Sequence, residues 1–434
     1  MLFFCFTIVH PLLFPALSIA QEPGETFTLK HTIENAIKVN LGLQSYKEET
    51  KAAMAVKKAQ RANFFPTLSA TYQYKRNDEE ISTPPFGIIG PENEYKFVTS
   101  LTQPLFTRFS VLNSYKISSL SLDAARINEK LKRNEVIFEA KRIYFGLLKA
   151  QKLLTVAKET VTQITAQKEV AKNYYKVGLT PLNDFLQAQV ELANTKQDFI
   201  VAQNNLEIAK LNFNTIIRRP IKSPVEIEDI LDYSPFEHII DYCIEMSKRK
   251  RLEIKIANLE IEIAEKKLAI AKKGYYPSIN LEANYFFNGT DWDVDGGEGI
   301  SDPEGWNIAA VASWNFWEWG RSYQGVKEKL SRVYQAKYNK EKILDNINLE
   351  VNQAYLNTRE AEKNIITIEK AIEQAKENFR ISKERYKGQM ATSTDVLDAQ
   401  TLLSKTMTNY YNALYDHKIS KAALYWAMGQ EIIE

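Results

Sequence analysis

The chain has 434 residues, with 56 Lys and Arg against 54 Asp and Glu, which gives a formal net charge of +2. The near-zero charge argues against a dedicated nucleic-acid binder, and two cysteines with four histidines exclude a disulfide framework or a zinc-finger array. With 44% hydrophobic and 25% charged residues, the chain is neither disordered nor a protein of many membrane helices. No proline follows Pro303, and because turns recruit proline, this tail predicts long uninterrupted helices.

Residues 1–20 are predicted to be a signal peptide. An apolar run ends at Ala20, with the small residue Ser18 two positions earlier, which is the pattern of a cleavage site. Pro11 and Pro15 disfavour a retained membrane helix. No later segment has 18 consecutive apolar residues, so no transmembrane helix is expected after it.

The rest of the chain is a duplication with a constant offset of 211 residues. The segment 64–66 recurs as 275–277, and 175–189 recurs as 386–400 with six of 15 positions identical, where chance gives about one. This offset predicts a first structural repeat over 21–217, a connector over 218–235 with three prolines, and a second repeat over 236–434.

Each half is expected to contain a helix, a strand, a polar loop, a second strand, a very long helix, a short break and a last helix. Apolar residues recur at helical spacing in the long stretches, and about 69 residues span roughly 100 Å. Helices of this length indicate a coiled coil or a helical array. The helices are predicted over 29–62, 109–177 and 182–217, and again over 236–273, 321–387 and 392–428.

Four segments alternate between apolar and polar residues, as strands with one apolar face do. They are 67–74, 95–105, 278–285 and 306–316. Their length and terminal aromatic residues are typical of transmembrane β-strands, although a soluble sandwich has the same alternation. Four strands in two separated hairpins cannot close a barrel, and bare sheet edges are forbidden in a bilayer, so a membrane location requires several copies of the chain.

The second hairpin loop, residues 289–305, carries Asp291, Asp293 and Asp295. This spacing faintly resembles a calcium loop but lacks the glutamate that an EF-hand requires. We expect a solvated outer loop and predict no metal site. The chain also shows no nucleophile–base pair, phosphate loop or paired-histidine motif, so we predict no catalytic residue, no cofactor and no enzyme activity.

Two short segments at the predicted breaks match the helix tips of a known family. They are Val177-Gly178-Leu179 with Asp184, and the stretch 394–399. With the signal peptide, the duplication and the element order, the chain resembles the TolC-like outer membrane efflux proteins over nearly its whole mature length. The resemblance implies a mainly α fold with a small β part: an internally duplicated α-barrel of long helices, with four transmembrane β-strands per protomer that complete a 12-stranded barrel in a homotrimer.

This resemblance implies a trimeric channel in the outer membrane, with a large periplasmic part. The channel would be the exit duct of a tripartite efflux or type I secretion system, a passive conduit with a gated periplasmic entrance. The implied partners are a periplasmic adaptor protein, an inner-membrane pump and outer-membrane lipid, with no nucleic acid. The alternative is a non-transporting coiled-coil envelope scaffold or adhesin stalk, which needs no aromatic strands.

The resemblance also assigns candidate residues to the entrance. Asp184 and Tyr386 occupy the positions of a polar gate link, while Ala391 stands where the family's arginine is expected, which predicts a looser or differently linked gate. Asp395 and Asp398 match the acidic entrance residues, and rings of acids select cations or bind blocking metal ions. Alternatively, Asp395 is only a carboxylate favoured at a helix N-terminus.

Two further groups of candidate residues complete the prediction. The glycines of the tips are expected to let the chain turn, and the tips to contact the adaptor; these residues are Gly178, Leu179, Thr180, Gly388, Gln389 and Met390. Aromatic residues at the strand ends are expected to lie at the membrane interface; these are Tyr72, Tyr74, Tyr285, Trp306, Trp314 and Trp317.

Overall fold

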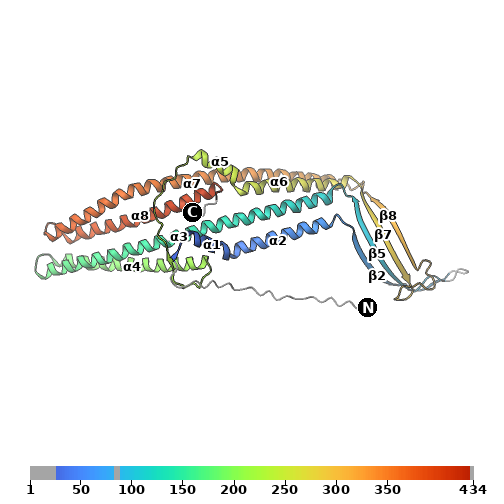
Figure 1. Cartoon of the computed structure of the whole chain (residues 1–434), viewed down its shortest axis with the longest axis horizontal. Coiled ribbons are helices and arrows are strands. Elements are labelled where there is room, and N and C mark those ends of the chain that lie inside the picture. Colours follow the sequence, from blue (N-terminus) through green and yellow to red (C-terminus); the bar gives the residue numbers. More distant parts are fainter. Residues whose placement is uncertain (1–25, 83–87, 431–434) are drawn as a thin grey trace. The chain divides into compact units, whose positions relative to one another are not determined.

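The computed structural model describes residues 26–82 and 88–430, and the predicted signal peptide lies outside them. The chain forms two compact units (Figure 1). Unit 1 contains the described residues up to Leu41 together with 133–245 and those from Glu350 onward, and unit 2 contains 42–132 and 246–349. Each unit therefore takes segments from both halves of the duplicated sequence.

Eight α-helices are described, and they repeat at the predicted offset. They are α1 (Leu29–Val39), α2 (Leu41–Ala62), α3 (Ser110–Lys176), α4 (Leu182–Ile216), α5 (Ile240–Lys250), α6 (Leu252–Ala271), α7 (Arg321–Lys387) and α8 (Ser393–Ala427), with a 3-10 turn at Lys272–Tyr275. Each helix of the first half begins 211 residues before its counterpart. Among the described residues, no helix combines the length and the apolar sequence needed to cross a membrane.

Two of the predicted helices are interrupted, so the predictions of single helices over 29–62 and 236–273 were wrong. Asn40 adopts an extended conformation between α1 and α2, and Arg251 separates α5 from α6 in the same way. The Asn40 N–H still bonds to the carbonyl of Ala36, which closes the last turn of α1. Apolar periodicity continues across both breaks, which is why it did not reveal them.

The four predicted strands form one antiparallel sheet in unit 2, in the order β2-β5-β7-β8. They are β2 (Thr67–Arg76), β5 (Asn93–Phe106), β7 (Ser278–Gly289) and β8 (Glu304–Ser313). The two hairpins are not separate, because β5 pairs with β7. The strand predicted over 306–316 ends at Ser313, opposite Ser278, because β7 begins only after Pro277 and offers no partner beyond that point.

The loops of this sheet contain little regular structure. Strands β3 (Ile81–Ser82) and β4 (Ile88–Gly90) form a small hairpin in the first loop. In the second loop, Gly289 bridges to Gly296. No cluster of acidic, histidine or cysteine side chains in the described residues is arranged to hold a metal ion.

The core of unit 1 surrounds a short parallel strand pair. Strand β1 (Thr26–Phe27) pairs with β6 (Glu226–Ile227) from the connector. The buried Tyr144 hydroxyl of α3 lies 3.1 Å from the carbonyl oxygen of Phe27 and 2.8 Å from that of Glu228. The single proton of this hydroxyl is shared between a carbonyl of β1 and the carbonyl that follows β6, which fixes the connector against α3.

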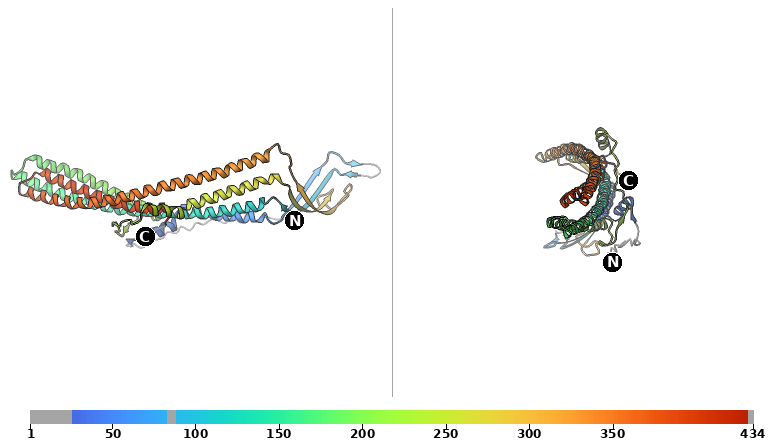
Figure 2. Two further views of the ribbon diagram at one scale, coloured as in Figure 1. Left: turned by 90° about the horizontal axis from the view of Figure 1, so that it is seen from above. Right: turned by 90° about the vertical axis from the view of Figure 1, so that its left-hand side faces the viewer.

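The C-terminal parts of α3 and α7, from residues 133 and 350 onward, also belong to unit 1. Figure 2 shows the α3–α4 pair and the α7–α8 pair lying side by side, each closed by a short turn. Buried residues from three helices pack between the pairs near the turns; they are Ile164, Ala171, Ala188, Leu192 and Leu397. This packing holds the two turns, which we call the first tip (residues 177–181) and the second tip (residues 388–392), next to each other.

Candidate functional site

Both tips end their long helix with the same hydrogen-bonded turn. In the first tip, the Gly178 N–H bonds to the Tyr175 carbonyl at 3.0 Å, and the Leu179 N–H to the Tyr174 carbonyl at 2.9 Å. In the second tip, the N–H groups of Gln389 and Met390 bond to the corresponding carbonyls at 3.0 and 2.8 Å. This is the Schellman arrangement, which satisfies carbonyls that a helix end otherwise leaves open.

The residue with left-handed backbone differs in type between the tips. Gly178 has φ +77° and Gln389 has φ +60°. In the second tip the left-handed conformation falls on Gln389, which is the counterpart of Gly178 at the 211 offset, and Gly388 precedes it in the same turn. Gly388 instead lies where a side chain would come within 3.2 Å of the Met390 methyl group.

The helices that follow the tips begin differently. Pro181 precedes α4 and makes no side-chain capping bond. Thr392 and Asp395 form a capping box at α8: the Thr392 N–H donates to Asp395 Oδ2 at 2.7 Å, and the Thr392 hydroxyl accepts from the Asp395 N–H at 3.2 Å. The alternative role of Asp395 as a residue of the helix N-terminus is therefore present in the structure.

The two predicted gate residues lie in one buried cluster. Tyr386 is 2% exposed and Asp184 is 8% exposed, and the Ser393 N–H donates to Asp184 Oδ2 at 3.4 Å. The Tyr386 ring packs 5.5 Å from that of Tyr174. Its hydroxyl is sealed from solvent, and no atom of the described chain meets hydrogen-bond geometry with it.

The charge of Asp184 acts on this hydroxyl. Burial, followed by the negative charge of Asp184, raises the pKa of Tyr386, while the nearby Ser393 and Thr180 side chains oppose the shift. The Thr180 hydroxyl is also buried without a hydrogen-bond partner among the described residues. The cluster thus holds polar groups that are close but incompletely paired, which costs stability.

Further polar contacts join the pairs, and sequence reasoning missed them. Gln187 and Thr394 are in contact at 2.5 Å, the Thr401 hydroxyl donates to Glu191 at 3.3 Å, and the hydroxyls of Thr160 and Ser404 lie 2.7 Å apart. The partners on α8 recur at positions 394, 401 and 404, which is the spacing of one helix face. That spacing of hydroxyl residues was the available signal.

The two predicted entrance acids are exposed on the first turns of α8. Hydrogen bonds from the backbone and side chain of Thr392 lower the pKa of Asp395. A ring of neighbouring acids has the opposite effect. Asp398 lies one turn further along α8 and is also exposed.

Each tip has an exposed apolar side chain. Met390 is 68% exposed and Leu179 is 51% exposed, whereas Thr180 is half-buried. Exposed apolar residues at a helix turn are typical of a protein-contact surface. The remaining predicted tip residues, Gly178, Gly388 and Gln389, are exposed with them.

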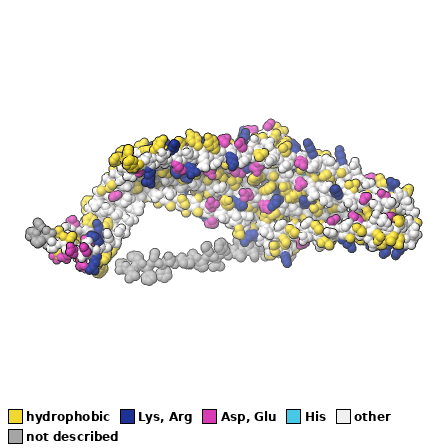
Figure 3. All heavy atoms as spheres, turned by 180° about the vertical axis from the view of Figure 1, so that it is seen from behind, with side chains coloured by type: hydrophobic (Ala, Val, Ile, Leu, Met, Phe, Trp, Pro, Cys, Tyr) yellow, Lys and Arg dark blue, Asp and Glu magenta, His cyan; other side chains and the backbone are white. Residues whose placement is uncertain are grey.

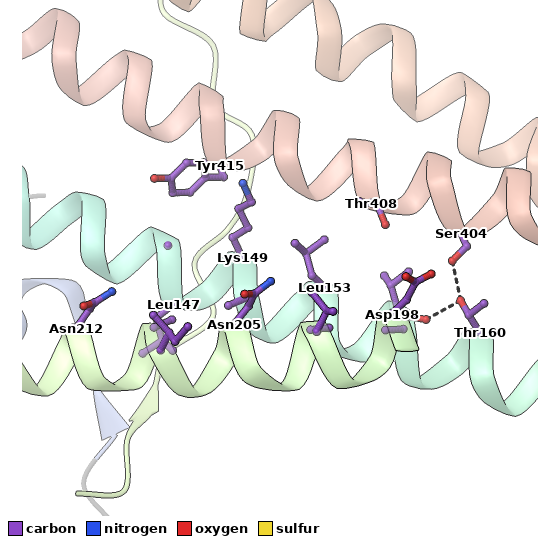
Figure 4. Close-up of a pocket in the computed structure, with 18 of the residues that line it drawn as sticks. Leu147, Lys149, Leu153, Thr160, Asp198, Asn205, Asn212, Ser404, Thr408 and Tyr415 are labelled. Carbon is purple, nitrogen blue, oxygen red and sulfur yellow. Dashed lines mark hydrogen bonds between the residues drawn. The ribbon is translucent and has the colours of Figure 1, made fainter. Parts of the chain in front are cut away.

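An open groove of about 660 Å³ lies between α3, α4 and α8 in the same unit. Figure 4 shows Asn205 and Asn212 on α4 below Tyr415 and Lys149, with Asp198 at the other end of the groove near Thr160, and the Lys149 ammonium lies 4.6 Å from the centre of the Tyr415 ring. Aliphatic side chains such as Leu147, Leu153 and Ile208 are the largest group in the lining, with amide and hydroxyl groups among them.

The predicted interface aromatics lie in unit 2, and all are exposed. Tyr285 pairs with Trp306 near the loop end of β7 and β8, and Tyr72 and Tyr74 lie near the loop end of β2, at the opposite edge of the sheet. At the other end of the sheet lie the exposed residues Trp314, Phe316, Trp317 and Trp319, which follow β8 and do not belong to it. Figure 3 shows hydrophobic side chains gathered where the sheet meets the helices.

The distance along the chain between these two aromatic groups can be compared with the thickness of the apolar layer of a membrane. Trp314 lies eight positions after Trp306, which corresponds to about 27 Å of extended chain. The apolar band of an outer-membrane barrel is about 25 Å tall and has aromatic girdles at both limits.

The fold is that of solved outer-membrane channels. CusC superposes with a TM-score of 0.81 over 95% of this chain and 96% of its own, at 17% identity. The CmeC outer membrane channel of Campylobacter jejuni superposes equally well, over 95% and 90% of the two chains at 18% identity. The outer membrane protein TolC of Vibrio cholerae is 21% identical over 309 residues, which cover 68% of this chain and 67% of TolC.

Two segments, 32–217 and 243–430, match the model of the outer membrane efflux protein family, and the chain belongs to that family. It is an outer-membrane protein of the TolC-like type with a helix-rich fold and a small sheet. Proteins of this family are channels and not enzymes.

Proposed function

We propose that this chain forms, as a homotrimer, the exit duct of a tripartite efflux or type I secretion system. The duct is a passive conduit through the outer membrane with a gated periplasmic entrance. Its partners are a periplasmic adaptor protein, which couples it to an inner-membrane pump, and the surrounding lipid.

The main support for this proposal is that the sheet has two unpaired edges. Within the described residues, β2 and β8 are the edge strands, and neither has a hydrogen-bonded neighbour on its outer side. Unpaired strand edges are not tolerated in a bilayer, and four strands are too few to close on themselves. Three copies that pair β8 with the next β2 give 12 strands and no free edge.

The tips supply the proposed entrance. In this proposal the buried Asp184, which accepts from the Ser393 N–H, and the packed ring of Tyr386 hold the pairs together in the closed state. Asp395 and Asp398 line the entrance as rings of three acids that attract multivalent cations. The exposed residues Leu179 and Met390, with the adjoining turn residues, contact the adaptor.

The aromatic groups supply the proposed membrane position. Tyr72, Tyr74, Tyr285 and Trp306 anchor one limit of the apolar band, and Trp314 and Trp317 anchor the other. A coiled-coil scaffold or stalk has no use for such strands. The sequence division into repeats at 21–217 and 236–434, with the connector between them, remains part of the proposal.

Conductance tests the duct. Protein purified in detergent and placed in planar bilayers is expected to run as trimers and to give discrete conductance steps. If the folded protein gives neither trimers nor conductance, the duct is excluded and the scaffold is favoured.

Cation block tests the acidic rings. Asp395→Asn combined with Asp398→Asn is expected to weaken block by trivalent cations about ten-fold, because three charges are lost at each ring. The asparagine at position 395 retains a side-chain oxygen for the helix cap, so folding is preserved. Asp198→Asn in the groove is the matched control, and unchanged block in the double variant would remove both acids from the entrance.

A further inference from the structure

The four-stranded sheet of unit 2 has one polar and one apolar face. Residues directly opposite each other in neighbouring strands share a face, so the register assigns every side chain to one of the two. One face carries polar residues from all four strands, among them Gln73, Lys96, Ser100, Asn284 and Asn307. In the duct of the proposed function this face lines the water-filled lumen, because the apolar face with its tyrosines and tryptophans meets lipid.

Phe286 of β7 departs from this polar pattern. It is the only aromatic residue that the described strands β2, β5, β7 and β8 place on the polar face, where it lies opposite Val98 of β5 and Gly305 of β8. Its ring leans onto β8, because a methyl group at position 305 would lie 2.6 Å from the ring carbon Cζ. The glycine leaves room for the ring, and the ring covers the backbone of the glycine.

The first hairpin shows that the sheet does not require an aromatic residue at this place. At the 211 offset, the pair Phe286 and Gly305 has a charged equivalent. Lys75 and Glu94 lie opposite each other on β2 and β5 in the same way, and they form an ion pair at 3.5 Å. A charged pair suits a wall that faces water, whereas a phenyl ring there stays partly solvated. The second hairpin therefore has an aromatic surface where strand pairing alone allows a hydrated ion pair.

A cation lies beside this ring on the same face. The exposed Lys96 ammonium lies 5.8 Å from the centre of the Phe286 ring, which is within the range of a cation–π contact. The neighbouring cations Lys75 and Arg76 are both paired with glutamates. Among the residues that the structure describes, no carboxylate lies within ion-pairing distance of Lys96. The ring and the ammonium together present an apolar surface and a free positive charge.

We propose that Phe286 and Lys96 form a binding site on the lumen wall for aromatic anions, such as arene carboxylates and sulfonates, that leave through the duct. The anionic group of the ligand pairs with the Lys96 ammonium, and its flat ring stacks on Phe286. A neutral aromatic compound lacks the ion pair, and an aromatic cation is repelled by Lys96. The site rests on the proposed function, because the polar face lines a lumen only in the assembled duct.

Partial block of the channel current tests the site. The probe is 1-naphthalenesulfonate, added to the side of a planar bilayer that the outer loops face, and it is expected to lower the conductance of the trimer. Lys96→Gln removes the charge and Phe286→Leu removes the aromatic surface, so each is expected to raise the half-blocking concentration about five-fold. Glu282→Gln is the control, because it removes a charge from the same face of β7 and should change this concentration less than about two-fold.

The charge of the probe provides a second measurement. Neutral 1-naphthol is expected to block more weakly than the sulfonate, and Lys96→Gln should leave its half-blocking concentration unchanged. Lys96→Arg keeps the positive charge and is expected to restore block by the sulfonate to within about two-fold of the unchanged protein. Block by 1-naphthol that weakens in Lys96→Gln as much as block by the sulfonate would contradict an ion pair at this site.

The outcomes separate the site from the duct. If the trimer conducts, but Lys96→Gln and Phe286→Leu are blocked by 1-naphthalenesulfonate as the unchanged protein is, the site is wrong and the duct stands. Block that depends on Lys96 and not on Phe286 would also overturn the site, because it reduces the contact to a charge on the wall. If the folded protein gives no conductance, the proposed function fails and the site fails with it.

Discussion

The first and second tips make the same two backbone hydrogen bonds, yet their side chains differ at nearly every position. The first tip has Gly178 in the left-handed position and Pro181 before the next helix; the second has Gln389 and a capping box on Thr392. Tyr175 is 41% exposed, whereas its counterpart Tyr386 is 2% exposed. Duplication has preserved the backbone path, while the side chains have diverged into one set that faces inward and one that faces outward.

Replacing the buried Tyr386 is expected to give the largest difference in stability between the two tips. Tyr386→Ala is expected to cost about 3 kcal/mol of local stability, because it empties a buried site packed against Tyr174. Tyr175→Ala is the matched change at an exposed ring and should cost about 1 kcal/mol or less. Hydrogen exchange of peptides that cover the two tips measures both, and equal effects would show that the tips are not distinct.

The residues that precede α4 and α8 provide a second comparison of the two tips. Thr392→Ala removes the side-chain half of the capping box and is expected to destabilise the start of α8 by about 1 kcal/mol. Pro181→Ala should change the start of α4 by less than about 0.5 kcal/mol, because Pro181 makes no side-chain capping bond. Exchange rates of the first-turn amides of α4 and α8 distinguish the two. A larger loss at Pro181 would contradict the assignment of the caps.

Exchanging the turn residues should act in opposite directions. Gln389→Gly is expected to stabilise the second tip by roughly 0.5–1 kcal/mol, because glycine adopts positive φ without a steric cost. Gly178→Ala should destabilise the first tip by a similar amount, and it isolates the backbone effect because open space surrounds the added methyl group. Thermal denaturation of tip contacts, followed by a fluorophore on each tip, gives the sign, and a destabilising Gln389→Gly would refute the backbone argument.

The smallest expected effect is a pH dependence at the second tip. The Thr392 hydrogen bonds favour the charged form of Asp395 and lower its pKa, so their stabilisation is present above the unfolded pKa and is lost as the pH falls through the folded one. The loss should therefore begin below about pH 4. Carboxyl chemical shifts of labelled aspartates measure this titration. Thr392→Ala should bring Asp395 back toward its ordinary pKa, and a titration unaffected by that substitution would exclude Thr392 as the cause.

Much of the fold could be predicted from the sequence because the repeat and the periodicity are strong physical signals. The long helices α3 and α7 and the start of β7 fall within a residue of their predicted positions. The breaks at Asn40 and Arg251 escaped because neither is a glycine or a proline, and the end of β8 escaped because it depends on the partner strand. A strand end that is set by pairing is not encoded in the strand's own residues.

The tip residues were less predictable. The placement of Asp184 and Tyr386 together follows from family resemblance, whereas the hydrogen bonds of Gln187, Glu191 and Thr160 depend on how two helix pairs meet. Gly388 was chosen as the turn residue by its type. The structure selects Gln389 because the hydrogen-bonded turn, and not the residue type, decides which backbone is left-handed.

Helices α3 and α7 are equal in length, and the length of each one constrains the length of the other. Both have 67 residues, and contacts such as that of the Tyr174 hydroxyl with the Lys387 carbonyl, at 3.3 Å, require the two to end level. One inserted residue would advance a tip by about 1.5 Å and turn it by about 100°. A single insertion in either helix is therefore expected to disrupt the contacts between the tips, whereas matched insertions of about seven residues in both helices would preserve them.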